Sequence, residues 1–153
     1  MVNKKVFAGL VVAILTSLHC YSEVITEENL SFGVFAIKNN SSISELSVSA
    51  NGRTSTTNSI RVLRGGQAAQ IRLVNYPLYT RLFISAILPQ SSTVFAGMTE
   101  QFSINHVDMP ETVITNYLGE AIFPLGATIE TSGNGGAYLD TTYNFRLMLT
   151  VNY

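Results

Sequence analysis

Few residues in this chain combine the types and the spacing that catalysis or metal binding requires. His106 and Asp108 stand two positions apart, so in a β-strand they share one face, and a carboxylate beside an imidazole can orient a base or a metal ligand. A surface histidine next to an acid is the simpler interpretation, because Glu27, Glu28 and Glu100 show no supporting spacing. We therefore expect no catalytic residue, no cofactor site and no metal site, and we predict that the chain is not an enzyme.

Two other patterns bear on ligand binding. Gly133-x-Gly135-Gly136 has no strand-to-helix context after it, so it predicts a hairpin turn rather than a phosphate loop. Several arginines fall in consecutive predicted strands, where they could form a stripe for carbohydrate or a polyanion, although ordinary outward-facing strand positions explain them more simply. These residues are Arg53, Arg61, Arg64, Arg72 and Arg81.

The first 22 residues have the layout of a secretory signal peptide. Lys4 and Lys5 precede an apolar run at residues 6–18, which is too short to span a bilayer comfortably. Cys20 and Ser22 are small residues placed three and one positions before a cut ahead of Glu23. We expect a leader at 1–22 and one secreted domain at 23–153, with no membrane span after cleavage; a short membrane anchor is the alternative.

Charge and cysteine content narrow the class of function further. Cleavage removes two lysines, so seven basic and ten acidic side chains remain and the net charge is near −3. Such a chain lacks the basic surface that nucleic acid or an anionic lipid requires. Cys20 is the only cysteine, and it leaves with the leader. The mature domain therefore has no disulfide and depends on its hydrophobic core for stability.

Alternation of apolar and polar residues recurs along the mature chain. Short runs at 30–36, 46–50, 69–73 and 78–86 repeat with a period of two and are separated by turns such as Asn51-Gly52. Weaker strands are expected at 93–97 and 100–107, and Gly119 and Pro124 predict a hairpin or a bulged edge strand. The pattern predicts a single all-β domain, an antiparallel β-sandwich or barrel of seven to nine strands.

The end of the chain carries the clearest strand pattern. Large apolar side chains occupy every second position from 143 onward, and mostly polar ones lie between them. This period of two predicts a half-buried strand whose inner face needs a cover. The inner residues are Tyr143, Phe145, Leu147, Leu149, Val151 and Tyr153.

Five segments together resemble a bacterial secreted family labelled domain of unknown function 4402. They are "LSFGVFA" near the mature start, "NGRTSTTNSIRVL", "GGQAAQIRLVN", "PLGATIET" and the terminal "GAYLDTTYNFRLMLTVNY". The terminal motif also resembles spore coat protein U-like subunits of chaperone–usher pili. Its matching residues are Gly136, Tyr138, Asp140, Tyr143, Leu149, Val151 and Tyr153.

The resemblance implies an immunoglobulin-like, pilin-like sandwich that acts as a non-catalytic fimbrial subunit in adhesion or biofilm. Such subunits lack their final strand and are completed by a strand from another chain. The implied partners are a periplasmic chaperone, an outer-membrane usher and like subunits in a polymer, and the implied route is through the periplasm to the cell surface. The C-terminal strand would be the assembly edge, and the N-terminal strand the candidate donor, with Val24, Ile25, Thr26, Leu30 and Phe32.

A second interpretation stays open. The chain can be a self-contained sandwich that pairs its own N-terminal strand and binds a carbohydrate or a protein without polymerising. Residues 23–29 are a short donor segment, and a glutamate from it would have to enter an apolar groove. Purification as a stable monomer would favour this second interpretation.

Overall fold

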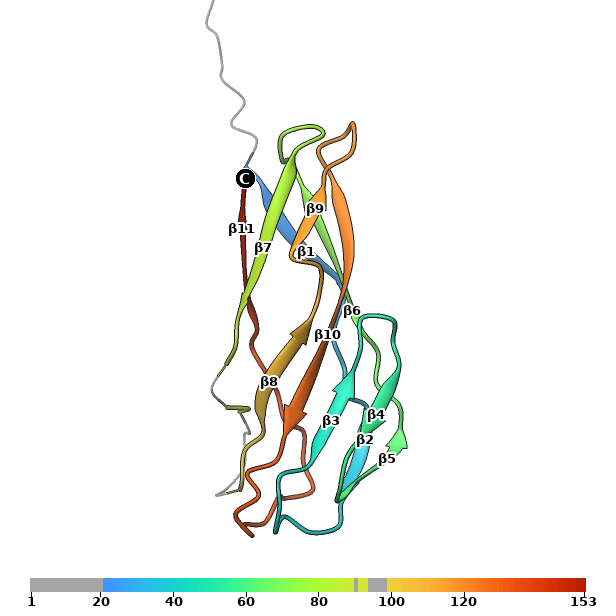
Figure 1. The fold of residues 1–153 in the computed structure, drawn as a ribbon, viewed down its shortest axis with the longest axis vertical. Coiled ribbons are helices and arrows are strands. Elements are labelled where there is room, and N and C mark those ends of the chain that lie inside the picture. Colours follow the sequence, from blue (N-terminus) through green and yellow to red (C-terminus); the bar gives the residue numbers. More distant parts are fainter. Residues whose placement is uncertain (1–20, 90, 94–98) are drawn as a thin grey trace, which may run out of the picture.

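The chain folds entirely from β-strands. The computed structural model describes residues 21–89, 91–93 and 99–153, and these contain eleven strands and no helix (Figure 1). The predicted all-β class is confirmed, but seven to nine strands was too low. Two of the strands have only three residues each, too few for an alternating pattern to be recognised in the sequence. The weak strand predicted at 93–97 lies mostly outside the described residues.

The main sheet is antiparallel and has the order β1–β6–β10–β3–β4, with β8 paired to the other edge of β10. Its strands are β1 (Glu23–Glu28), β3 (Glu45–Val48), β4 (Thr54–Thr56), β6 (Ala69–Val74), β8 (Ser103–Asp108) and β10 (Ala121–Glu130). β1 begins at the residue that follows the predicted cleavage point. Residues 1–20 lie outside the described part, so the leader stays a prediction.

Two smaller sheets cover this one. β7 (Arg81–Ile87) lies between β11 (Met148–Asn152) and β9 (Thr112–Ile114), and β2 (Val34–Ile37) pairs with β5 (Ile60–Arg64). The molecule is elongated, with the β11–β7–β9 sheet in its upper half and the β2–β5 pair in its lower half (Figure 1). Among the described residues, no helix has the length and hydropathy that a membrane-spanning helix needs.

β10 is the central strand, which corrects the hairpin or edge strand predicted around Pro124. Its first half, Ala121 to Leu125, pairs with β6, and its second half pairs with β3 on one edge and β8 on the other. Pro124 is tolerated because only β6 pairs with β10 at that level. Gly126 marks the change of partner: a Cβ there would collide with the backbone of Val48, Ser49 and Ala50.

Two hydrophobic clusters fill the interior, and β10 contributes to both. The upper cluster packs Ile71 and Leu73 of β6 against Leu82 and Ile84 of β7. The lower cluster surrounds Phe102, and the β2–β5 pair closes it from outside. The residues of β10 in these clusters are Ala121, Phe123, Leu125, Ala127 and Ile129.

Candidate functional site

Asp108, singled out in the sequence together with His106, makes a contact that holds two elements of the fold together. Both residues lie on β8, and the Asp108 carboxylate accepts a hydrogen bond from the backbone N–H of Ala50 at 2.7 Å, which ties β8 to the turn after β3. His106 pairs with Thr128 on β10 and is exposed. In the described part of the chain, no three His, Cys, Asp or Glu residues gather as metal ligands would.

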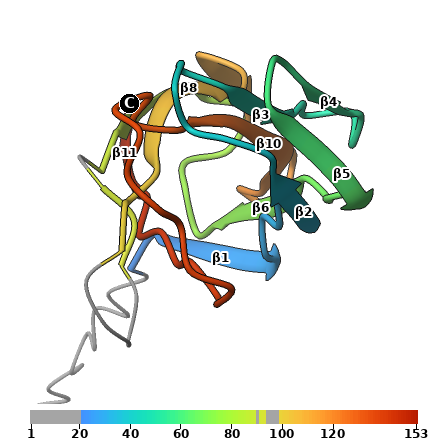
Figure 2. The same cartoon turned by 90° about the horizontal axis from the view of Figure 1, so that it is seen from below.

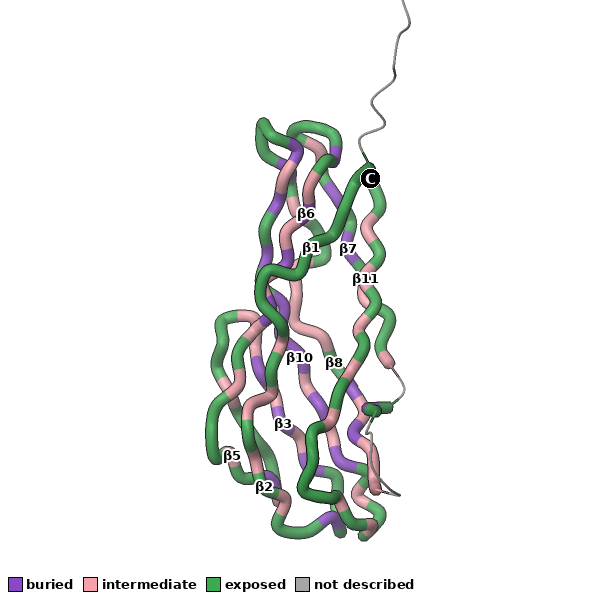
Figure 3. The backbone as a smooth tube through the Cα atoms, turned by 180° about the vertical axis from the view of Figure 1, so that it is seen from behind, coloured by how far each residue is buried: buried purple, intermediate pink, exposed green. Residues whose placement is uncertain are grey.

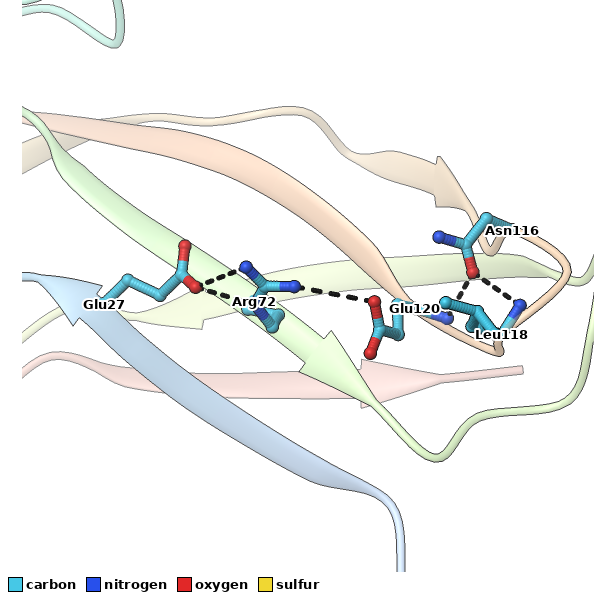
Figure 4. Close-up of polar contacts among 5 residues, drawn as sticks. All are labelled: Glu27, Arg72, Asn116, Leu118 and Glu120. Atoms are coloured by element: carbon cyan, nitrogen blue, oxygen red, sulfur yellow. Dashed lines mark hydrogen bonds and ion pairs between the residues drawn. The ribbon is translucent and has the colours of Figure 1, made fainter.

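The arginines do not form a stripe. Arg61 and Arg64 belong to β5, Arg72 to β6 and Arg81 to β7, and these strands lie in three different sheets. Arg72 instead forms ion pairs with Glu27 of β1 at 2.6 Å and with Glu120 at 3.5 Å (Figure 4). The bond to Glu27 raises the pKa of the Arg72 guanidinium further above its usual range. The ion pair between Arg72 and Glu27 fastens β1 to β6, its neighbour in the main sheet.

The glycine-rich stretch is a bend and not the predicted hairpin turn, because β10 ends at Glu130 and the next strand, β11, pairs with β7 rather than with β10. The buried side chain of Asn40 holds it: its amide nitrogen donates to the Gly136 carbonyl at 2.9 Å, and its oxygen accepts from the Gly133 N–H at 2.9 Å. Gly135 N–H donates to the Asn40 carbonyl at 2.7 Å. Asn40 therefore joins the loop before β3 to the loop after β10.

A long groove of about 1200 Å³ runs along the surface. It runs past β10 from Leu125 to Ile129, a distance of about 13 Å for four residues of strand. One wall is residues 26–37, which include β2, and the other is residues 138–147 with Leu149. In the view from below, β2 and β11 lie on opposite sides of the molecule's middle (Figure 2).

The C-terminal wall contains most of the predicted assembly edge. Tyr143, Phe145, Leu147 and Leu149 line the groove and are half-buried, whereas the residues between them are exposed (Figure 3). The alternation predicted for 143–153 is thus present, although the regular strand covers only Met148–Asn152. Ahead of β11, Asn144 and Thr93 exchange backbone hydrogen bonds of 2.8 and 3.0 Å.

The two remaining residues of that predicted edge lie beyond the groove. Val151 is half-buried against the upper cluster. Tyr153 is 71% exposed and meets Tyr76 edge to face at 6.0 Å between ring centroids. The structure therefore places four of the six predicted edge residues in the groove wall.

The N-terminal wall contains Thr26, Leu30 and Phe32 of the candidate donor residues. β1 does not fill the groove, because it pairs with β6 and lies at the margin, exposed along its whole length (Figure 3). Val24 and Ile25 are 39% and 36% exposed.

A β-bulge turns the end of β1. The register shifts between Thr26 and Glu28, so Thr26 faces Ile71 and the groove, while Glu28 faces Gln70. Gln70 sits between the buried Ala69 and Ile71, so its side chain and that of Glu28 point outward. The bulge keeps the glutamate out of the apolar interior.

Aromatic rings close the lower end of the groove. The Phe102 ring stacks on Tyr138 at 4.4 Å and meets Tyr143 at 4.8 Å and Phe35 at 5.6 Å. Tyr138 donates its hydroxyl hydrogen to the Gln101 carbonyl at 3.1 Å. Burial raises the pKa of Tyr138 above its ordinary value of 10.0, against the lowering effect of the Ser132 hydrogen bonds.

Sequence reasoning missed Phe35 and Phe102 as groove residues. Alternation in the run at 30–36 puts Leu30, Phe32, Val34 and Ala36 on one face and Phe35 on the other, but a register shift between Val34 and Phe35 turns Phe35 inward. Phe102 precedes β8 and falls in the weak strand expected at 100–107, but its ring meets rings from distant segments, which the local pattern does not show. The one sequence signal near these residues is Gly33, a glycine inside the predicted run at 30–36. In the structure its φ is +79°, and the nearby carbonyl of Arg64 leaves no room for a side chain.

A comparison with models of protein families, with functionally characterised proteins and with solved structures finds no match for the chain. The groove is therefore interpreted from its own geometry. It combines a long apolar floor, two walls from the two ends of the chain, and no cluster of reactive side chains among the residues that line it.

Proposed function

We propose that the protein is a non-catalytic, secreted surface subunit whose groove is completed by an extended strand from another chain. The observation that carries this proposal is the groove itself, which is long, apolar and bordered by the two ends of the domain. The predicted leader, the all-β fold and the resemblance to chaperone–usher subunits support the same assignment. The partners it calls for are a periplasmic chaperone, an usher and like subunits of a fimbrium.

The size of the groove favours a polypeptide over a small molecule. Pockets for drug-sized ligands have volumes of about 300–1,000 Å³, and this groove has about 1200 Å³. An extended strand places a side chain on one face every two residues, so its alternate residues can follow the groove. Each apolar side chain that becomes fully buried there contributes about 1.5–3 kcal/mol.

The strands beside the groove offer a free edge for backbone pairing. β1 and β11 are the outermost strands of their sheets in the described part of the chain. Asn144 and Ala137 form backbone bonds towards residues 93 and 100, which leaves the opposite side of their segment facing the groove. An unpaired edge next to an apolar floor is a site for strand addition, and also an aggregation hazard until it is covered.

A second candidate function is a binding module that does not polymerise. The observation in its favour is that β1 is already paired with β6, with Glu27 fixed to Arg72. Within the described residues, no N-terminal segment remains free to act as a donor strand for a neighbour. In this case, the groove takes a strand or a loop from an unrelated protein ligand.

The test uses a matched pair of substitutions in adjacent residues. Leu147 lines the groove, whereas Met148 is 58% exposed on the opposite face. We expect heat-sensitive multimers from the cell surface of the source organism, with Leu147→Asp abolishing them and Met148→Asp leaving them intact. Circular dichroism of the purified variants checks that both remain folded.

The outcomes separate the two candidates. Two results together support the binding module. The wild-type protein released from the cell surface is monomeric, and a synthetic peptide of alternating apolar residues raises its thermal midpoint. A chain that is monomeric and unaffected by such peptides contradicts both.

A further inference from the structure

Two loops form one end of the molecule, at the opposite end from the glycine-rich stretch (Figure 1). One joins β6 to β7 at residues 75–80, and the other joins β9 to β10 at residues 115–120. We call them the tip. Leu78 and Leu118 are each 57% exposed, Tyr117 is 66% exposed and Tyr79 is 71% exposed. Four large apolar or aromatic side chains are thus presented to solvent by two adjacent loops, outside the groove.

The tip is rigidly built. Thr115 is buried, and its hydroxyl donates to the Pro77 carbonyl at 2.6 Å while accepting from the Thr80 N–H at 2.8 Å. The Tyr76 N–H donates to the Gly119 carbonyl at 3.1 Å, which joins the two loops a second time. The four exposed side chains therefore stand on a preformed frame.

Tyr79 has an uncommon backbone conformation. Its φ is +51°, in the left-handed region that bulky residues seldom adopt. Glycine would satisfy this conformation without strain, yet the position carries a large aromatic ring at the apex of an exposed loop. A strained residue maintained at an exposed position indicates a functional demand for its side chain.

The polar groups of the tip are directed inward. The Asn116 side-chain oxygen accepts from the N–H groups of Leu118 and Glu120 at 2.8 and 3.0 Å, and the Thr80 hydroxyl donates to the Leu78 carbonyl at 3.0 Å. These bonds satisfy part of the polar groups of the tip, and each satisfied group lowers the cost of entering an apolar medium.

The tip carries little charge. Residues 75–80 and 115–120 contain one charged side chain, Glu120 at the base of its loop, and this carboxylate pairs with Arg72 at 3.5 Å. Tyrosine favours the interface between lipid headgroups and acyl chains, and leucine favours the acyl region itself. An internally bonded tip with two of each residue and no unpaired charge fits that boundary.

We propose that the tip binds the surface of a lipid bilayer, with Leu78, Tyr79, Tyr117 and Leu118 inserted at the headgroup–acyl boundary. Because the tip carries no basic residue, the interaction does not depend on anionic lipid or on salt. This inference does not rest on the proposed function, since the tip residues are not groove residues.

The test is flotation of the purified chain with vesicles of phosphatidylcholine alone and of phosphatidylcholine mixed with phosphatidylglycerol. We expect binding to both, unchanged by added salt. Leu118→Ser should weaken it by roughly tenfold, as loss of one inserted apolar side chain predicts. Leu63→Ser is the control, because Leu63 is 64% exposed on β5, far from the tip.

Tyr79→Gly separates an effect on vesicle binding from an effect on folding. It removes the ring and relieves the strained φ, so the thermal midpoint should stay or rise while vesicle binding falls. Absence of binding by the wild-type chain, binding only to the anionic vesicles, or equal binding by Tyr79→Gly would each overturn the proposal. Dimers that Tyr79→Gly disrupts, without vesicle binding, would assign the tip to contacts between copies instead.

Discussion

Thr115 is the residue on which the tip most depends. It is 1% exposed, and its hydroxyl serves both the Pro77 carbonyl and the Thr80 N–H. Thr115→Val keeps the shape but leaves these two backbone groups without a partner, so we expect a loss of about 1–3 kcal/mol in the free energy of unfolding. Urea unfolding measures it. Thr150→Val, on the exposed face of β11, should change stability by less than about 0.5 kcal/mol.

Tyr138 gives the groove a pH dependence at alkaline pH. Burial raises its pKa in the folded state above the ordinary value of 10.0, so the fold favours the neutral phenol. This contribution to stability is complete below pH 10.0, and it is lost as the pH rises through the folded-state pKa. We expect the urea midpoint of the wild-type chain to fall with pH above that value, and to fall less steeply in Tyr138→Phe.

Tyr76 supplies the comparison for this experiment. Burial raises its pKa as well, so Tyr76→Phe should remove a separate part of the same alkaline slope. If Tyr138→Phe and the wild-type chain lose stability in parallel as pH rises, the phenol of Tyr138 is not held in its neutral form by the fold.

Individual groove residues were predictable only where side chains alternate without interruption. Residues 143–151 follow a period of two, so Tyr143, Phe145, Leu147 and Leu149 were identified from the sequence alone. Phe35 was assigned to the wrong face, because a shift of register in β2 is set by pairing with β5 and leaves no trace in the local pattern. The aromatic end around Phe102 depends on contacts between distant segments.

Among the strands, β10 depends on one glycine at the point where it changes partners. Gly126 lies where this strand stops pairing with β6 and enters the space between β3 and β8. A methyl group there meets the backbone of Val48 and Ser49, which cannot move aside as a side chain can. We expect Gly126→Ala to cost about 1–3 kcal/mol.

The matched change is Gly52→Ala in the turn after β3. Its φ is +78°, but a Cβ there has open space around it, so only the backbone conformation opposes the substitution. Thermal unfolding compares the two variants. A larger loss of stability in Gly52→Ala than in Gly126→Ala would mean that the close approach of β10 to β3 is not a tight constraint.

β1 is an exposed edge strand of the main sheet. It is exposed throughout and is anchored by pairing with β6 and by the Arg72 ion pairs. Arg72→Gln should therefore speed hydrogen exchange of the β1 amides while leaving those of β10 unchanged, because local opening needs fewer broken contacts than global unfolding. Arg61→Gln, exposed on β5, is the control. Equal protection of β1 in both variants would show that the ion pairs do not hold this strand.

Alternation predicted where strands lie, but it did not predict which strands are central in a sheet and which lie at an edge. Pro124 suggested an edge strand, because the sequence does not show that β10 has a free edge at that level. The C-terminal strand was predicted too long, because among the described residues the backbone of 143–147 pairs only at the bridge between Asn144 and Thr93. Both differences arise from pairing across the molecule, which local periodicity does not encode.

For the whole molecule, β10 makes the two halves one cooperative unit. Phe123 and Leu125 lie in the upper cluster, and Ala127 and Ile129 lie in the lower one, on a single continuous strand. Loss of the upper cluster must therefore unfold the strand that organises the lower one. Leu73 is fully buried in the upper cluster.

We expect Leu73→Ala to lower the free energy of unfolding by about 2–5 kcal/mol while the chain still unfolds in a single transition. The chain has no tryptophan, so tyrosine is the near-ultraviolet probe. With Tyr76 and Tyr153, which pair in the upper half, replaced by phenylalanine, the near-ultraviolet signal of the Phe102–Tyr138–Tyr143 cluster reports on the lower half, and far-ultraviolet circular dichroism reports on the strands as a whole. Coincident midpoints from the two signals support one unit. If the aromatic signal persists after most of the strand signal is lost, the lower half folds on its own, and a partner strand in the groove would then stabilise that half alone.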